Sequence, residues 1–455
     1  MGENGAVSAD LAGVTDSKGY FTSSAVWRFI PGLSAAAVVV SALWGRVALY
    51  ADGSNYLYWI VRRRSFYWSS YEHLMSRSEA QVITQAPVRL ALAAHFYPLP
   101  WLVTLFGVGL FVIPNALWMV AIYRLRESRR FWFFSALYAL TLCTQFYAVS
   151  ESLVTYSLVA LVASLVLDGQ APTPRRAWGV ALMSLALIAS YEITLVLAPL
   201  LGALVMTWWW RSGERRRSPA LLVPVGTTLA SLFAATVLAF LTVRSHAESA
   251  SPSNALSLTF LSRGGHIVIV ATCVALALGA SLYLSGRRRL VVVGAAALSE
   301  VVLFDPNHWP IPAVAYYGRV YVGLAIGLAL ALAAPAFFAH RLPRDTPVTK
   351  YVVSFLIVVL SVSFVANAEG FGSWNRSLQR IVTTHRGVLP FFSGLGRSVH
   401  QFYRYGWFWT TPEQSLLDQT ARHQAVVNNP SPSQNFEITP GTPSSYLSPR
   451  YFRGA

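Results

Sequence analysis

The stretch "LYADGSNYLYWIVRRRSFYW", residues 49–68, decides how the chain is organised, because it begins where a long apolar run ends. One acidic residue, Asp52, follows that run, and aromatic residues then alternate with the triple arginine of Arg62, Arg63 and Arg64. A helix of this composition is typical of the membrane surface, where rings face lipid and guanidinium groups face phosphates. The stretch therefore predicts a membrane exit followed by a helix lying in the headgroup plane.

The same contrast between apolar runs and short basic connections extends along the rest of the chain. Of the 455 residues, 55% are hydrophobic and only 12% are charged. Crossing a hydrocarbon core about 30 Å thick takes roughly 20 apolar residues. We therefore predict an all-α polytopic membrane protein with about eleven transmembrane helices. The predicted spans are residues 29–48, 100–123, 131–149, 153–168, 177–192, 194–210, 219–243, 265–285, 290–304, 320–339 and 351–368.

The distribution of basic residues predicts the orientation of these spans. About half of the 35 Lys and Arg residues lie in short connections after alternate spans, as in cytoplasmic loops. Residues 1–28 are then a cytoplasmic tail, 29–368 a transmembrane domain and 369–455 a segment outside. The first 28 residues lack the order of a cleavable signal, so the first span is expected to stay as an anchor. The location expected is a bacterial inner membrane.

The net charge of +16 does not require a nucleic-acid partner, because the arginines lie at span ends and not along one soluble face. The first outer loop, residues 51–99, is expected to hold helices that lie on the membrane. The C-terminal segment begins with basic and aromatic residues, and its end from 428 to 455 is rich in Ser, Pro and Asn. Such a composition predicts poor order at the end of the chain.

Acidic residues near span ends gather on the predicted outer side. They are Asp52, Glu151, Glu192, Glu300 and Asp305. An ionisable group at membrane depth costs a few kcal/mol, so each is a candidate for function. This shared side predicts a functional site at the outer membrane interface.

Asp52 is the candidate for the chemical step. A carboxylate at the bilayer surface, partly desolvated, has a raised proton affinity and can take a proton from an attacking hydroxyl or bind a divalent cation. The dipeptide Asp52-Gly53 is also typical of a simple turn, which is the alternative interpretation. Glu151 and Glu192 suit recognition of sugar hydroxyls from the cavity wall, or structural pairing with an outer arginine.

Arginines supply the charge that a phosphate leaving group requires, because the guanidinium fork matches phosphate oxygens and stays protonated. Arg319 opens the tenth predicted span beside Tyr316 and Tyr317, so it is a candidate for substrate binding or, alternatively, a snorkelling anchor. Arg62, Arg63 and Arg64 favour a surface that binds lipid headgroups. His308, close to Asp305 in "DPNHW", suits a sugar-facing loop. The histidines show no spacing typical of a zinc site, and no cofactor beyond a divalent cation is indicated.

Taken together, these features resemble the GT-C superfamily of membrane glycosyltransferases. The resemblance covers most of the chain and lies in its architecture: an acidic residue after the first span, a long first outer loop, about eleven spans and a late outer segment. It implies a polyprenyl-phosphate-linked sugar donor, with Asp52 as general base or metal ligand. Many members carry a paired acidic motif where this chain has Asp52-Gly-Ser-Asn. The implied acceptor is a glycan, lipid or protein, as in polysaccharide biosynthesis of a cell envelope.

Two other classes remain open from the sequence. A polymerase or ligase of lipid-linked glycans would depend on late outer residues, here Arg319, His308 and His385, and not on Asp52. A transporter or lipid flippase would need broken spans and ionisable residues at mid-membrane depth, whereas the acids here crowd to one side. The chain has no phosphate-cradling Gly-Lys-Ser/Thr loop and no Gly-x-Ser-x-Gly elbow, which disfavours nucleotide-driven transport and serine hydrolysis.

Overall fold

A computed structural model gives the fold of most of the chain, and the predicted helical class is confirmed. It describes residues 26–67, 77–248 (less 129, 147, 148, 150, 212 and 214–217), 312–339, 347–390, 410–428 and 445–452, with isolated positions elsewhere. Within these residues the only strands are β1 (Val388–Leu389) and β2 (Val426–Val427), which pair in parallel.

Helices account for nearly all of the regular structure. The first half of the chain forms α2 (Ile30–Trp44), the 3-10 turn η1 (Val47–Leu49), α3 (Asp52–Arg63), α4 (Ser78–Ala93), α5 (Leu99–Gly107), the π-helical η3 (Val108–Val112), α6 (Ile113–Tyr123), α7 (Phe131–Gln145) and α8 (Ser152–Val166). The second half forms α9 (Pro174–Leu185), α10 (Thr194–Trp210), α11 (Pro219–Glu248), α14 (Pro312–Phe338), α15 (Pro347–Thr384), α17 (Thr411–Leu417) and η7 (Pro449–Phe452).

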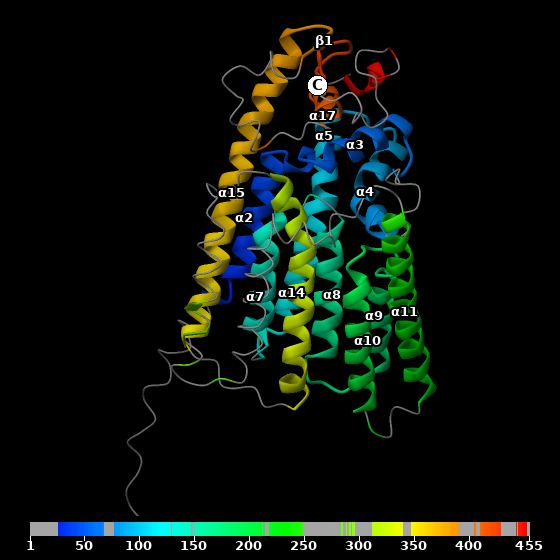
Figure 1. Cartoon of the computed structure of the whole chain (residues 1–455), viewed down its shortest axis with the longest axis vertical. Helices are drawn as coiled ribbons and strands as arrows, with labels where there is room; N and C mark the ends of the chain where they lie inside the picture. The colour runs from blue at the N-terminus through cyan, green and yellow to red at the C-terminus, as the bar shows by residue number, and fades with distance from the viewer. Residues whose placement is uncertain are drawn as a thin grey trace, which may run out of the picture.

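The long helices stand side by side, and α3, α4 and α17 lie at one end of them (Figure 1). α15 packs along α2 and α7, α6 packs on α8, and α10 and α9 both pack on α11. At the upper end of Figure 1, α3 and α4 lie under α17 and the C-terminal residues. We call this the cap end, and we call residues 410–428 with 445–452 the cap segment.

Three helices are long and apolar enough to cross a membrane: Leu99–Tyr123, Pro219–Arg244 and Lys350–Thr384. They contain the predicted spans 100–123, 219–243 and 351–368, and the third helix extends well beyond its predicted span. Shorter apolar helices occur at Ile30–Trp44, Phe131–Leu142, Ser152–Val166, Thr194–Trp210 and Val322–Phe338, within or overlapping five further predicted spans. The full set of eleven spans is therefore not established.

Two kinds of difference separate the predicted spans from the structure. The predicted span 177–192 is too long, because α9 ends at Leu185 and is followed by turns before Thr194. The predicted spans 265–285 and 290–304 lie outside the described residues, apart from isolated positions.

The end opposite the cap is held by one acidic residue. Asp168 accepts hydrogen bonds from Arg124 Nη2 and Arg176 Nη1, each at 3.1 Å, and its backbone carbonyl accepts one from Arg130 Nη1 at 2.5 Å. Arg130 also donates to the carbonyl of Phe337 at 3.1 Å, which joins α14 to this end. Some of the basic connections predicted from the sequence thus converge on one carboxylate.

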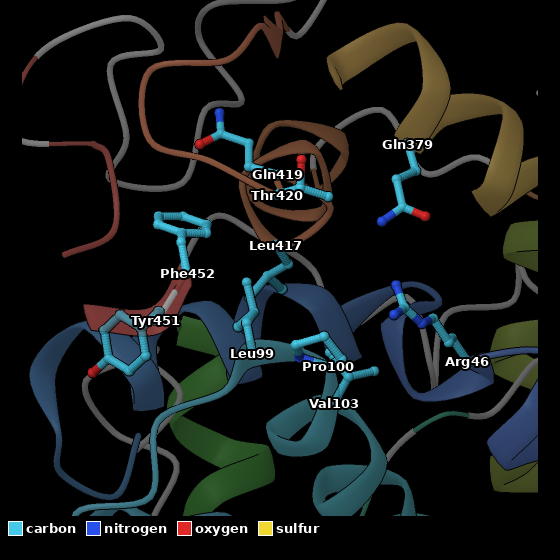
Figure 2. A pocket seen from close by; sticks show the side chains of 10 residues that line it. All are labelled: Arg46, Leu99, Pro100, Val103, Gln379, Leu417, Gln419, Thr420, Tyr451 and Phe452. Atoms are coloured by element: carbon cyan, nitrogen blue, oxygen red, sulfur yellow. The ribbon is translucent and has the colours of Figure 1, made fainter. Parts of the chain in front are cut away.

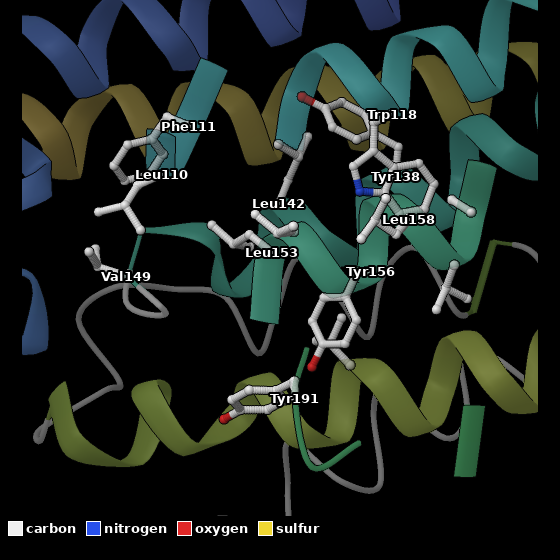
Figure 3. Close-up of a cluster of buried hydrophobic side chains, with 14 of the residues drawn as sticks. Leu110, Phe111, Trp118, Tyr138, Leu142, Val149, Leu153, Tyr156, Leu158 and Tyr191 are labelled. Atoms are coloured by element: carbon white, nitrogen blue, oxygen red, sulfur yellow. The ribbon is translucent and has the colours of Figure 1, made fainter. Parts of the chain in front are cut away.

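The core between α6, α7 and α8 is apolar and aromatic (Figure 3). A polar pair within this core joins Tyr138 to Asn115. The Tyr138 hydroxyl donates to Asn115 Oδ1 at 2.7 Å, which satisfies the buried phenol. Tyr156 reaches toward α14 in Figure 3. Gly323 of α14 allows this approach, because a side chain there would lie 2.8 Å from the Tyr156 ring.

The cap segment covers α3, which corrects the prediction that this helix lies on the membrane surface. Residues 56–61 of α3 are all buried, and its aromatic face meets protein. The Tyr58 hydroxyl donates to the Ser445 carbonyl at 2.7 Å, and the Tyr451 hydroxyl donates to the Val61 carbonyl at 2.6 Å. These bonds satisfy phenol groups that a lipid surface would leave to water, so the aromatic pattern encodes packing under the cap.

The predicted boundary at residue 368 does not end a helix. α15 continues unbroken from Pro347 to Thr384 and carries its last turns up to the cap segment. The end of the chain also differs from the expected poor order where it is described, since Ser445, Leu447 and Tyr451 are buried. Residues 429–442 lie outside the described residues.

Candidate functional site

Asp52 follows an unusual backbone path. Arg46 has a φ of 53°, the 3-10 turn η1 follows, and Ala51 has a φ of 51° with a ψ of −130°. A residue other than glycine in such a conformation costs about 1–3 kcal/mol and is frequent where function requires a fixed geometry. Asp52 is the first residue of α3 directly after Ala51. The turn therefore fixes where the helix begins, and with it the position of the Asp52 carboxylate.

Gly53 makes this path possible. A side chain at this position would lie 2.0 Å from the Ala48 carbonyl oxygen and 3.1 Å from Val149 Cγ1. The backbone N–H of Gly53 donates to the Tyr50 carbonyl at 3.1 Å. The dipeptide Asp52-Gly53 thus opens a helix that is pressed against η1 and the α7–α8 connection, which overturns the alternative of a simple loop turn.

Arg77, which sequence analysis did not single out, pairs with Glu192 and lies within electrostatic range of Glu151. Arg77 Nε donates to Glu192 Oε1 at 2.7 Å, and its guanidinium group lies 5.0 Å from the Tyr191 ring centroid. Burial opposes the charge of Arg77, but attraction by Glu192 first, and then by Tyr191, Tyr56 and Glu151, raises the pKa of Arg77. We call Arg77, Gln81, Glu151 and Glu192 the Arg77 cluster.

Glu151 is almost fully buried at the start of α8. Its Oε1 accepts a hydrogen bond from Gln81 Nε2 at 3.1 Å, while its Oε2 has no hydrogen-bond partner among the described residues. An unpaired buried carboxylate oxygen is an acceptor available to a ligand hydroxyl or a cation. This geometry fits the predicted role of Glu151 in recognition, whereas among the described residues the carboxylate forms no ion pair with an arginine and Arg77 attracts it only at longer range.

Glu79 holds α4 in place beside this cluster. Its backbone N–H donates to the Ala189 carbonyl at 2.9 Å, and the Ala189 N–H donates to Glu79 Oε2 at 3.2 Å. Partial burial raises the pKa of Glu79, and the two backbone N–H groups of Ala189 and Ile188 partly offset that effect. This reciprocal pair fixes the α9–α10 connection, and hence Glu192, relative to Arg77.

α3 connects Asp52 to the Arg77 cluster. Tyr56 lies one helical turn after Asp52, on the same side of the helix, and is close enough to Arg77 to affect its charge. Gly53 approaches Val149, which precedes Glu151 by two residues. The structure thus places Asp52, Glu151 and Glu192 in one region at the cap end, where residues of α3 link Asp52 to the two glutamates.

For the predicted site residues after position 300, the structure describes at most the backbone. Arg319, Tyr316 and Tyr317 belong to the first turns of α14, but their side chains lie outside the described residues. Gly323, one turn after Arg319, approaches Ile193, whose Cγ1 would lie 2.6 Å from a side chain there. The start of α14 therefore runs toward the connection that carries Glu192. Asp305 and His308 lie outside the described residues.

The three arginines of the opening stretch, predicted to bind lipid headgroups, each lie against a different aromatic side chain. Arg62 Nη1 donates to the Tyr58 hydroxyl at 2.6 Å, Arg63 lies 4.3 Å from the Trp59 ring centroid, and Arg64 lies 5.1 Å from the Tyr97 ring centroid. Burial raises the pKa of Tyr58 to about 12 despite the opposing charge of Arg62. α3 ends at Arg63, and Arg64 follows it with a φ of 53°.

Sequence reasoning missed a buried polar network in the cap segment. Asp418 Oδ1 lies 3.6 Å from Arg46 Nη1 and accepts from Asn375 Nδ2 at 3.3 Å, while Gln414 Nε2 donates to Asn375 Oδ1 at 2.7 Å. Burial raises the pKa of Asp418 to about 7, against the charge of Arg46. The string Thr411-Pro-Glu signals a helix start, but burial of this network follows from distant contacts.

Glu413 is the second buried acid of the cap segment. Its two carboxyl oxygens have no hydrogen-bond partner in any other described residue. Burial raises the pKa of Glu413 to about 8.

Within the described residues, no three His, Cys, Asp or Glu side chains gather as a metal site would require. A scan of protein-family models and searches of curated proteins and solved structures find no match to this chain.

Proposed function

We propose that the protein is an integral membrane glycosyltransferase of GT-C type, which moves a sugar from a polyprenyl-phosphate donor to an acceptor on the outer face of the membrane. One observation carries the proposal: the strained turn that begins α3 at Asp52 lies near the Arg77 cluster, since Gly53 approaches Val149 and Tyr56 affects the charge of Arg77, at the end of a bundle with helices long and apolar enough to cross a membrane. Carboxylates, one arginine and a covering segment are thus assembled beside the predicted bilayer surface.

The proposed reaction is a single displacement. The acceptor oxygen forms a bond to the anomeric carbon while the bond from that carbon to the phosphate oxygen breaks, and the polyprenyl phosphate leaves with the electron pair. Asp52 takes the proton of the acceptor hydroxyl. Glu151 accepts a substrate hydrogen bond through its unpaired Oε2, and Glu192 stays paired with Arg77. Arg319 is the proposed partner of the departing phosphate.

Asp52→Asn tests this assignment directly. The amide keeps the shape of the side chain but accepts no proton at neutral pH, so sugar transfer from a polyprenyl-phosphate donor should fall by about 10²-fold or more. The assay uses purified protein in bilayer discs with radiolabelled donor. Asp52→Glu is the conservative control and should retain part of the activity.

Undiminished transfer by Asp52→Asn, in a protein with unchanged thermal unfolding, would overturn the role of Asp52. Loss of activity in Arg319→Ala and His308→Ala, together with an active Asp52→Asn, would favour the lipid-linked glycan ligase instead. Facilitated movement of lipid without any transfer product would favour the flippase.

A further inference from the structure

Three arginines from distant parts of the chain gather around two tyrosines at the cap end. Arg64 follows α3, Arg89 belongs to α4, and Arg450 belongs to η7 of the cap segment. The Arg64 and Arg450 guanidinium groups lie 5.1 and 5.5 Å from the Tyr97 ring centroid, so both charges adjoin one ring. The Tyr451 ring meets Tyr97 edge-on, with the two centroids 5.8 Å apart. We call Arg64, Arg89, Arg450, Tyr97 and Tyr451 the Tyr97 cluster.

Tyr451 joins two of these arginines. Its hydroxyl donates to the Val61 carbonyl at 2.6 Å and is hydrogen-bonded to Arg64. Burial raises the pKa of Tyr451, and the charges of Arg64 and Arg89 partly oppose that effect, so Arg89 lies close enough to act on the same hydroxyl. Tyr451 also lines the small pocket of Figure 2, where its hydroxyl points away from Leu417 of α17. The three cations thus share one region between α3, α4 and η7.

The positive charge of the cluster is not compensated within the described residues. Arg64, Arg89 and Arg450 form no ion pair there. Arg64 Nη2 and Arg89 Nε also lack a hydrogen-bond acceptor in the part of the chain that the structure describes. All three side chains are at least partly exposed, so an anion can reach their outer N–H groups. Since like charges repel, an anion between them would replace repulsion by attraction.

Exposed apolar side chains near the cluster indicate the source of such an anion. Leu90 in α4, Phe96 in the α4–α5 connection and Trp101 in the first turn of α5 are all exposed. α5 opens the helix Leu99–Tyr123, which is long and apolar enough to cross a membrane. An exposed tryptophan at the end of such a helix is typical of the membrane–water interface. We therefore expect the cluster at the depth of lipid headgroups.

Arginine chemistry favours a phosphate group as the ligand. The guanidinium fork matches phosphate oxygens in a bidentate arrangement and stays protonated. Basic pockets at the membrane surface bind the headgroups of anionic lipids. Three uncompensated cations favour a lipid with net negative charge, because the ammonium group of a zwitterionic headgroup would be repelled.

We propose that the Tyr97 cluster binds the phosphate of an anionic phospholipid, and that this lipid holds η7 of the cap segment against α3 and α4. Arg450 supplies the contact from η7, while Arg64 and Arg89 supply those from the helices beneath. The inference does not rest on the proposed sugar transfer, because the length of α3 separates Arg64 from Asp52 by about 18 Å along the helix axis.

Titration of the detergent-solubilised full chain with phosphatidylglycerol, followed by native mass spectrometry, tests the site. Arg89→Gln and Arg450→Gln should each weaken binding about tenfold, as expected for loss of one charge-assisted hydrogen bond. Arg422→Gln is the matched control, because Arg422 is an exposed arginine of the cap segment outside the cluster, and binding should be unchanged. In phosphatidylcholine discs, added phosphatidylglycerol should slow hydrogen exchange of residues 445–452 in the unaltered chain and not in Arg450→Gln.

The outcomes separate this proposal from its rivals and from the proposed function. Equal affinity of both cluster variants and the unaltered chain, or equal exchange with and without phosphatidylglycerol, would overturn it. Displacement of the lipid by inorganic phosphate at equal concentration would assign the cluster to a free anion instead. Binding of polyprenyl phosphate but not of phosphatidylglycerol would assign it to the sugar donor. Asp52→Asn should bind phosphatidylglycerol as the unaltered chain does, so failure of the transfer assay leaves the lipid site standing.

Discussion

At the scale of single residues, the cap end is organised by a few charges withdrawn from water. Arg77 compensates Glu192 directly and Glu151 at longer range, and each of the two ion-paired side chains is no more than 20% exposed. Removing one partner of such a pair leaves the other charge buried without compensation, which is worse than never having buried the pair. Arg77 is therefore a positioning residue whose loss affects both acids together.

Arg77→Gln should lower the free energy of unfolding by about 3–5 kcal/mol, because it strands Glu192 and Glu151. Arg77→Lys should recover part of this loss. Thermal unfolding of the detergent-solubilised protein measures the effect. The control is Arg126→Gln, since Arg126 and Glu127 form a pair with side chains 66% and 81% exposed, where a change within about 0.5 kcal/mol is expected.

The buried carboxyl group of Glu413 should make the free energy of unfolding depend on pH. Its pKa is raised from 4.5 to about 8 in the folded chain, so the folded state binds the proton more tightly than the unfolded state. The free energy of unfolding is then highest below pH 4.5 and falls as pH rises toward 8. Each pKa unit corresponds to about 1.4 kcal/mol, so the loss amounts to a few kcal/mol.

Glu413→Gln should remove this loss and stabilise docking of the cap segment at pH 8 relative to the unaltered chain. Hydrogen exchange of residues 410–428 at pH 5 and pH 8 measures docking. Glu127→Gln, at an exposed site, should leave the pH dependence as it was. Equal exchange of Glu413→Gln and the unaltered chain at both pH values would contradict the assignment.

At the scale of elements, the start of α3 depends on Gly53. A methyl group there would be 2.0 Å from the Ala48 carbonyl, and backbone atoms cannot yield as a flexible side chain can. Gly53→Ala should lower the free energy of unfolding by about 2 kcal/mol or more and reduce sugar transfer. Gly202→Ala in α10 is the control, because nothing lies within 4 Å of that position, so the chain should be unaffected or slightly stabilised. Thermal unfolding and the transfer assay report both effects.

An element could be predicted from the sequence when local residues specify it, and could not when contacts between distant parts of the chain do. α11 and the continuous helix of α5, η3 and α6 were predictable because an apolar run alone specifies them. The enclosure of α3 was not, because Ser54 meets the Thr410 carbonyl and Tyr58 meets Ser445 across most of the chain. An aromatic stripe looks the same whether lipid or protein covers it.

The residues of the candidate site also fall into those that local sequence predicts and those that only distant contacts bring together. The gathering of Glu151 and Glu192 was predictable from alternating loops, since residues after outward spans share one side. Their common partner Arg77 was not, because it is one of several arginines in the first outer loop and only the fold selects it. Gln419 and Asp418 carried no local signal at all, since their burial depends on α15 and η1.

At the scale of the whole molecule, the two ends should face opposite sides of a membrane. Arg380 at the cap end and Arg126 at the other are both exposed. With Cys143 and Cys273 replaced by alanine, Arg380→Cys should react with an impermeant maleimide added outside intact cells, and Arg126→Cys should react only after lysis. Labelling of both from the same side would contradict the proposed orientation.

The unbroken length of α15 has a mechanical consequence. Its 38 residues span about 57 Å at 1.5 Å per residue, so roughly half of the rod stands clear of a 30 Å hydrocarbon core. Helices adapt to bilayer thickness by tilting. The last turns of α15 lie farthest from the predicted hydrocarbon core, so a given tilt displaces them, and the cap segment bonded to them, more than the rest of the helix. Hydrogen exchange of residues 410–428 should therefore differ between discs of short-chain and long-chain lipids, and equal exchange in both would show that α15 is braced against tilting.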